Sequence, residues 1–208
     1  MARPRESTDG ELFAATARVM QRRGPAQLTL AEVAKEAGVA PATLVLRFGS
    51  KRNLLLETCR SGIRDEGAQF AAGRAKHKSP LKALLELYVE CSSFAATPES
   101  LAIGLAYLQN DLTDPDFRAV TREQFQATRR ETRKILDEAV GAGELVRCDT
   151  KALARFLQQV FHGSMVDWAV FREGTLRERL RKDLQALVRP YRNRGGSNQK
   201  KRKAVASG

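Results

Sequence analysis

The stretch AEVAKEAGVAPATLVLRFGSK, residues 31–51, combines two short helical patterns with a glycine between them. Ala34 and Ala37 lie where the second helix must approach the first, and their small side chains allow a close crossing. Gly38 stands at the turn, where glycine tolerates backbone dihedrals that other residues avoid. The stretch therefore predicts a helix-turn-helix, against the alternative of an ordinary helical hairpin inside a core.

Both helices carry start signals. Thr29 and Glu32 have the spacing of a capping box, in which each side chain bonds a backbone N–H of the other residue. Pro41 suits the first turn of the second helix, because its missing N–H would be unpaired there anyway. Arg47 and Lys51 follow, and a core hairpin would not readily leave such a basic cluster at its end. This arrangement favours a nucleic-acid contact.

The net charge of +12 over 208 residues is unevenly distributed. Residues 1–62 carry +4, residues 63–188 carry only +1, and residues 189–208 carry +7. A near-neutral middle between a basic head and a very basic tail indicates a polyanionic partner that is contacted at the ends.

Almost every segment is rich in strong helix formers, and strand-like alternation is nearly absent, so we expect an all-α fold of about nine helices. No run of about 18 apolar residues suggests a membrane span, and the N-terminus has no apolar run typical of a signal peptide. Cys59, Cys91 and Cys148 are far apart, which argues against a disulfide framework or zinc site and favours a cytoplasmic location.

Over residues 10–56 the sequence resembles the DNA-binding head of the TetR family of transcriptional regulators. The matching positions are Thr29, Val33-Ala34, Gly38-Val39, Thr43-Leu44, Phe48 and Ser50-Lys51. The resemblance implies a helix-turn-helix DNA-binding domain at 1–52 and an effector-binding and dimerisation domain at 53–190. The composition of residues 191–208, with almost nothing apolar, predicts a basic, disordered tail. The resemblance also implies a repressor that a small-molecule effector releases from its DNA operator. A non-specific architectural DNA-binding protein is the alternative, for which the basic tail is the best argument.

The resemblance further implies roles for individual residues in the head. Thr29, Thr43 and Lys51 would contact phosphates, and the exposed face of residues 41–47 would read base edges. An N-terminal arm would reach an adjacent groove, although a frayed terminus is an equal alternative. The full set of expected DNA contacts is Arg3, Arg5, Thr29, Pro41, Ala42, Thr43, Leu46, Arg47 and Lys51.

The recognition helix departs from the family pattern at three positions. Val45, Leu46 and Arg47 stand where family members commonly carry Tyr-His-Tyr. Arg47 would hold a guanine edge or a phosphate, or else lay its stem over the core. With few polar groups left on this helix, apolar contact to thymine methyl groups would contribute to base reading.

The expected helix at 151–172 carries two apolar stripes, and only one of them can fill the core of its own chain. The second stripe, together with a leucine stripe on the last helix, predicts a homodimer through a four-helix bundle. The alternative is that both stripes are intramolecular core. The predicted interface residues are Phe156, Gln159, Gly163, Val166, Val170, Leu180 and Leu184.

Large side chains of the middle helices are candidates for the pocket of a small apolar or aromatic effector, although residues at this spacing are more often plain core. These candidates are Phe94, Leu105, Tyr107, Phe125, Phe161, Met165 and Trp168. His77 and His162 are isolated, and no GxSxG or Gly-rich phosphate loop is present. We therefore expect no enzyme, no metal site and no cofactor.

Overall fold

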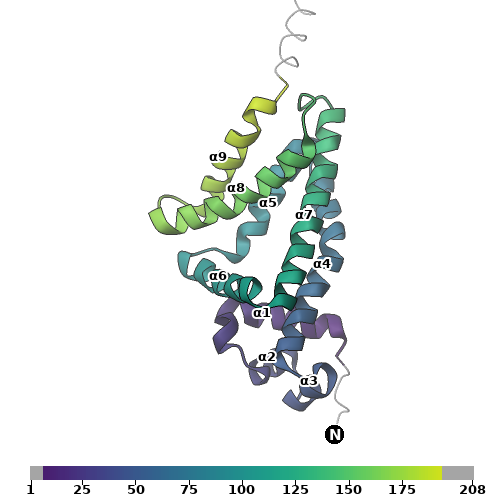
Figure 1. Ribbon diagram of the computed structural model, residues 1–208, viewed down its shortest axis with the longest axis vertical. Helices are drawn as coiled ribbons and strands as arrows, with labels where there is room; N and C mark the ends of the chain where they lie inside the picture. The colour runs from purple at the N-terminus through teal and green to yellow at the C-terminus, as the bar shows by residue number, and fades with distance from the viewer. Residues whose placement is uncertain (1–6, 194–208) are drawn as a thin grey trace, which may run out of the picture.

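The computed structural model describes residues 7–193, apart from the side chain of Pro25, and the regular elements within this range are helices joined by turns and loops (Figure 1). Nine α-helices and two short 3-10 helices lie within these described residues, which confirms the predicted all-α fold. The α-helices are α1 (Asp9–Gln27), α2 (Leu30–Ala37), α3 (Pro41–Phe48), α4 (Lys51–Ala75), α5 (Pro80–Cys91), α6 (Pro98–Thr113), α7 (Pro115–Gly141), α8 (Thr150–Phe171) and α9 (Leu176–Val188). The 3-10 helices are Ser92–Phe94 and Arg189–Tyr191.

Helices α1 to α3 form a compact head at one end of the molecule (Figure 1). Both α1 and α2 begin with a complete capping box, at Thr8 with Glu11 and at Thr29 with Glu32. Gly24 leaves helical geometry with φ 73° and ψ 172°, and the chain then makes one more turn to Gln27. Gly24 therefore marks a kink within α1.

The hydrophobic core of the head draws on helices outside it. Leu44 of α3 and Leu54 of α4 are fully buried among apolar side chains of α1 and α2. Phe117 and Val120, from the first turns of α7, belong to the same cluster. The head is therefore packed directly onto the body.

The body is an elongated helical bundle in which α4 and α7 run away from the head along the long axis (Figure 1). Its core is a second cluster that α5, α7, α8 and α9 fill, with Leu84, Leu136, Leu157, Leu180 and Leu184 fully buried. None of the helices described is both long and apolar enough to span a membrane.

The last described residues close the end of the body opposite the head. Val146 N–H donates to the Tyr191 carbonyl at 2.8 Å, and Asn193 N–H donates to the Glu144 carbonyl at 3.0 Å. Residues 191–193, which the sequence assigns to a disordered tail, are thus paired with the turn after α7, and that assignment is wrong for them. The rest of the predicted tail, 194–208, lies outside the described residues.

Gly73 marks the closest approach of α4 to α5. A Cβ built on Gly73 would overlap Leu87 Cδ1 and lie 3.0 Å from Leu87 Cγ, and Leu87 is itself buried. Gly67, two turns earlier on the same helix, has open space where its Cβ would be. Alanine substitutions at the two glycines therefore distinguish the effect of packing on stability from the effect of helix propensity.

We predict that Gly73→Ala destabilises the protein by about 1–3 kcal/mol, because overpacking forces Leu87 and its neighbours to move. Gly67→Ala should stabilise it by about 0.5–1 kcal/mol, since alanine loses less backbone entropy in a helix. Urea denaturation of both variants checks this. Equal effects of the two substitutions would contradict the close α4–α5 contact.

Candidate nucleic-acid interface

The turn between α2 and α3 has the geometry that the sequence predicts. Gly38 adopts the left-handed conformation, with φ 70° and ψ 30°, and its N–H donates to the carbonyl of Lys35 at 3.3 Å. Val39 N–H donates to the Ala34 carbonyl at 2.9 Å, and the Ala34 side chain is buried under α3. These contacts hold two short helices close together as a helix-turn-helix.

The outward face of α3 is apolar along its centre. Leu44 is fully buried, and a helix advances by about 100° per residue, so Ala42 and Leu46 lie on the side opposite Leu44. Leu46 is 92% exposed, and Val45 beside it is 49% exposed. Pro41 and Ala42 are also exposed, so this face is open to solvent along the whole helix.

The three predicted phosphate contacts lie at the starts of three consecutive helices, α2, α3 and α4. Thr29 caps α2, and its hydroxyl accepts from the Glu32 N–H at 3.2 Å and donates to the Glu32 carboxylate at 3.1 Å. Thr43 is in the first turn of α3, and Lys51 is the first residue of α4, next to the Ser50 cap. Helix N-termini attract anions, which suits all three positions.

Arg47 is engaged with the start of the chain. Its Nε lies 2.7 Å from the Asp9 carboxylate, and its Nη1 donates to the Ser7 carbonyl at 2.7 Å. These partners lie about 40 residues away in sequence, so no local pattern indicates them. The predicted arm residues Arg3 and Arg5 lie outside the described residues, and Ser7 is the first described residue, adjacent to α3.

Arg52 joins the head to the body. Its guanidinium contacts Asp114 at 2.8 Å and Asp116 at 2.7 Å, and it lies 5.7 Å from the ring centre of Phe117. Asp114 is both the C-cap residue of α6 and the N-cap residue of α7. Its carboxylate accepts a hydrogen bond from the Asp116 N–H at 2.9 Å. Hydrogen bonds from Arg52 lower the pKa of Asp114. The joint thus places one cation at the corner where three helices meet.

The predicted effector residues line none of the three cavities that are described. Phe161, Met165 and Trp168 are buried in the body core, where the Trp168 indole N–H donates to the Gly174 carbonyl at 3.1 Å. Phe125 stacks on His162 with ring centres 5.1 Å apart. Phe94, Leu105 and Tyr107 lie apart from that core, with Phe94 and Leu105 partly exposed and Tyr107 half-buried.

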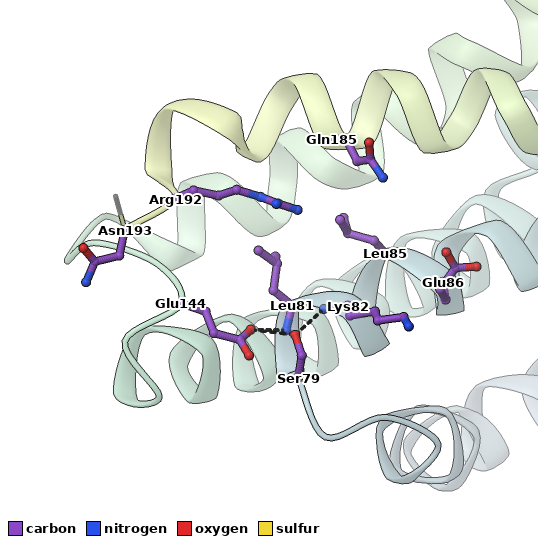
Figure 2. Close-up of a pocket in the computed structure, with 9 residues that line it drawn as sticks. All are labelled: Ser79, Leu81, Lys82, Leu85, Glu86, Glu144, Gln185, Arg192 and Asn193. Carbon is purple, nitrogen blue, oxygen red and sulfur yellow. Dashed lines mark hydrogen bonds between the residues drawn. The ribbon is translucent and has the colours of Figure 1, made fainter. Parts of the chain in front are cut away.

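The described cavities lie elsewhere. A groove of about 560 Å³ opens between α5 and α9, where Leu81 and Leu85 point from α5 toward α9 (Figure 2). At its end the Glu144 carboxylate accepts from Ser79 Oγ at 3.0 Å and from Leu81 N–H at 2.9 Å. None of the predicted effector residues lines this groove, so it does not correspond to the predicted pocket.

A buried polar set on the inner side of α7 was missed from the sequence. Thr128 donates to the Glu66 carboxylate, and Thr132 bonds the buried Tyr88 hydroxyl at 2.9 Å. The other Glu66 oxygen, Oε2, is buried without a partner among the described residues, as is the Tyr107 hydroxyl. Burial raises the pKa of Glu66. Thr128 and Thr132 are four residues apart and therefore lie on one face of a long helix. This spacing is the feature of the sequence that could have indicated the polar set.

An apolar surface runs along the outer side of α8. Phe156, Gln159, Gly163, Val166 and Val170 are all exposed, and Val170 is 70% exposed. A cavity of about 510 Å³ lies over Gly163, Val166 and Val170.

Leu180 and Leu184 of α9 do not share that surface. Both are fully buried in the core of their own chain, so their assignment to a dimer interface is wrong. Their spacing identified one face of α9 correctly, but that face packs inward.

Two family profiles match the chain. The profile described as "Bacterial regulatory proteins, tetR family" matches residues 12–58, and the one described as "BetI-type transcriptional repressor, C-terminal" matches residues 78–193, more than half of the chain. The HTH-type transcriptional regulator BetI of Agrobacterium fabrum is 36% identical over 97 residues, which are 46% of this chain and 47% of that protein. The chain thus spans about half the length of the curated relatives it matches.

Solved structures share the fold over most of the chain. A TetR transcription regulator from Haloarcula marismortui has a TM-score of 0.69 at 17% identity, covering 88% of this chain and 97% of that one. A putative transcriptional regulator from Saccharomonospora viridis, solved in complex with choline, has a TM-score of 0.69 at 18% identity, covering 87% and 95%. At these identities the likeness concerns the fold alone. With the two profiles together, the chain belongs to the TetR family of bacterial regulatory proteins.

Proposed function

We propose that this chain is a homodimeric, sequence-specific DNA-binding repressor that a small-molecule effector releases from its operator. The observation that carries the proposal is the exposed outer face of α3 within a helix-turn-helix, flanked by Thr29, Thr43 and Lys51 at helix starts. A helix of this kind enters the major groove, while residues at neighbouring helix starts hold phosphates. The protein acts by binding, and it catalyses no reaction.

The parts of the chain around the two hydrophobic clusters have different functions in this proposal. Residues 1–52 bind DNA, residues 53–190 bind the effector and the second chain, and the basic residues beyond add affinity for phosphates. A second copy covers the apolar surface of α8, since helix-turn-helix proteins read two half-sites with two-fold symmetry. Exposed Val166 and Val170 support this arrangement, because an apolar stripe on a long helix is normally covered.

The effector binds inside the body, against the polar inner side of α7. Unpartnered buried atoms are costly, so the Oε2 of Glu66 and the Tyr107 hydroxyl support a ligand that supplies hydrogen-bond donors. Phe125 of α7 and His162 of α8, which stack on each other, support a ligand with an apolar or aromatic part. The pocket forms as the ligand opens these helices, a population shift toward a minor conformation.

Release follows from the contacts between body and head. Phe117 and Val120 of α7 pack in the core of the head. Arg52 of α4 forms ion pairs with Asp114 and Asp116, where α6 ends and α7 begins. A ligand that moves α7 therefore moves α3 and changes the spacing of the two recognition helices. Coupling of about 1–3 kcal/mol, the usual range, lowers operator affinity about 5- to 150-fold.

The phosphate contact of Lys51 is tested on a random-sequence duplex pool. Lys51→Ala should weaken binding to all sequences and reduce the salt slope by about one for each lost phosphate contact. Lys182→Ala, at an exposed position of α9, is the control and should leave the slope unchanged, since α9 belongs to the body and not to the head. Fluorescence anisotropy at several salt concentrations measures both, and equal slopes for the two variants would refute the Lys51 contact.

The dimer is tested with a charge placed on α8. Val166→Glu should weaken self-association at least about tenfold, because burying an unpaired carboxylate in an apolar interface is unfavourable. Val146→Glu is the matched control, since Val146 is equally exposed but lies outside α8. Analytical ultracentrifugation measures both, and a Val166→Glu variant that remains as dimeric as the control would remove α8 from the interface.

The role of Glu66 predicts an unusual pH dependence of stability. Its pKa is raised by burial, so the ionised form costs stability above the folded-state pKa, and this cost disappears below the unfolded value of about 4.3. Glu66→Gln should therefore raise the melting temperature at pH 7 by roughly 1–3 °C, and have no such effect at pH 4.

Glu123→Gln, an exposed position on α7, is the control for that experiment and should change neither value. Thermal unfolding followed by circular dichroism measures all three proteins at both pH values. A Glu66→Gln variant that is destabilised at pH 7 would mean that Glu66 is a satisfied structural group, with no polar site kept open for a ligand.

A further inference from the structure

We propose that α3 reads its operator chiefly through the 5-methyl groups of thymine, and that Leu46 is the residue that makes this contact. The inference rests on the proposed function, because it names the chemistry that the DNA-binding face selects. It identifies the operator as one whose half-sites carry thymine at the position that faces the middle of α3.

The outward surface of α3 is an apolar ridge. Its most outward ridge consists of Ala42 and Leu46, one turn apart and opposite the buried Leu44. Leu46 is the most exposed large apolar side chain among the described residues. Val45 widens the ridge on one side, and Thr43 is the one hydroxyl on the other. The centre of the helix therefore offers methyl groups where recognition helices need base contacts.

The Arg47 side chain contacts groups of its own chain. Among the residues of α3 it alone has a long, charged side chain suited to a guanine edge. Its guanidinium instead bonds the Asp9 carboxylate and the Ser7 carbonyl, both at 2.7 Å. Using Arg47 for a base would compete with these two contacts for the same guanidinium. Arg47 is thus a positioning residue that ties the first described turn of the chain to α3.

Charge identifies the occupant of this apolar ridge as DNA. The helix itself carries no acidic residue and one basic residue, and the starts of α3 and α4 lie at its borders. Helix N-termini and Lys51 attract phosphates. The DNA backbone presents phosphates at regular intervals, whereas a protein partner of ordinary composition does not. In the major groove the 5-methyl group of thymine is the group that pairs with an apolar side chain, and it distinguishes A·T from T·A.

The experiment removes the methyl groups alone. The duplex most enriched from a random-sequence pool is prepared with deoxyuridine in place of thymidine at single positions of both half-sites. At the positions that face Leu46, binding of the full-length protein should weaken about fourfold for each methyl group lost, the value of about one buried methylene. Leu46→Ala should bind the thymidine duplex more weakly and show little further loss with deoxyuridine.

Leu112→Ala is the control variant, because Leu112 is also exposed but lies on α6. It should retain the full effect of deoxyuridine. If the wild-type protein binds every deoxyuridine duplex as tightly as the thymidine duplex, the inference is refuted while the proposed function stands. The same holds if 7-deazaguanine, which removes the N7 acceptor, weakens binding more than deoxyuridine, since Arg47 would then read guanine. If no duplex is enriched at all, the proposed function and the inference fail together.

Discussion

The position of the recognition helix depends on a hydrophobic core that the head cannot complete alone. Leu44 anchors α3 from its inner side, and Phe117 and Val120 of α7 enter the same cluster. Burying a side chain of this size contributes about 1.5–3 kcal/mol, whereas exposed ion pairs contribute little. Packing of α3 against α2 and α4, within the cluster that Phe117 and Val120 complete, therefore holds α3 in place. The Arg52–Asp114 contact fixes the angle of the corner without supplying most of the energy.

The same helix connects the two ends of the proposed mechanism. Within α7, Val120 packs into the head, while Thr128, about two turns further along, bonds the half-buried Glu66 of α4. A helix transmits displacement because its hydrogen-bonded turns resist bending, so a ligand that reorganises the Glu66 region acts on the head through α7. In the proposed mechanism the unsatisfied oxygens of Glu66 and Tyr107 have a physical role, since a site that must open for a ligand cannot also be the most stable packing.

Local signals in the sequence were sufficient for the head. Thr29 and Gly38 act through neighbours within five residues, and the structure contains both the cap and the turn that they predict. Leu184 shows the limit of such signals, because periodicity identifies an apolar face without saying which surface covers it. Arg47 and Glu66 depend on partners some 40 and 60 residues away, and only the packed chain brings those together. The predicted pocket residues show the same limit, since aromatic spacing fits a filled core, where Phe161 and Trp168 lie, as well as a cavity.

The central claim is that two copies of this chain read a symmetric DNA sequence. Sequencing the duplexes that the full-length protein retains from a random pool, at about physiological salt, tests it most directly. The account predicts an enriched palindrome whose half-sites are centred one helical turn, or a multiple of it, apart. Retention of DNA without any enriched sequence would contradict it and indicate a non-specific architectural protein. A failure to retain DNA would contradict the role of the helix-turn-helix itself.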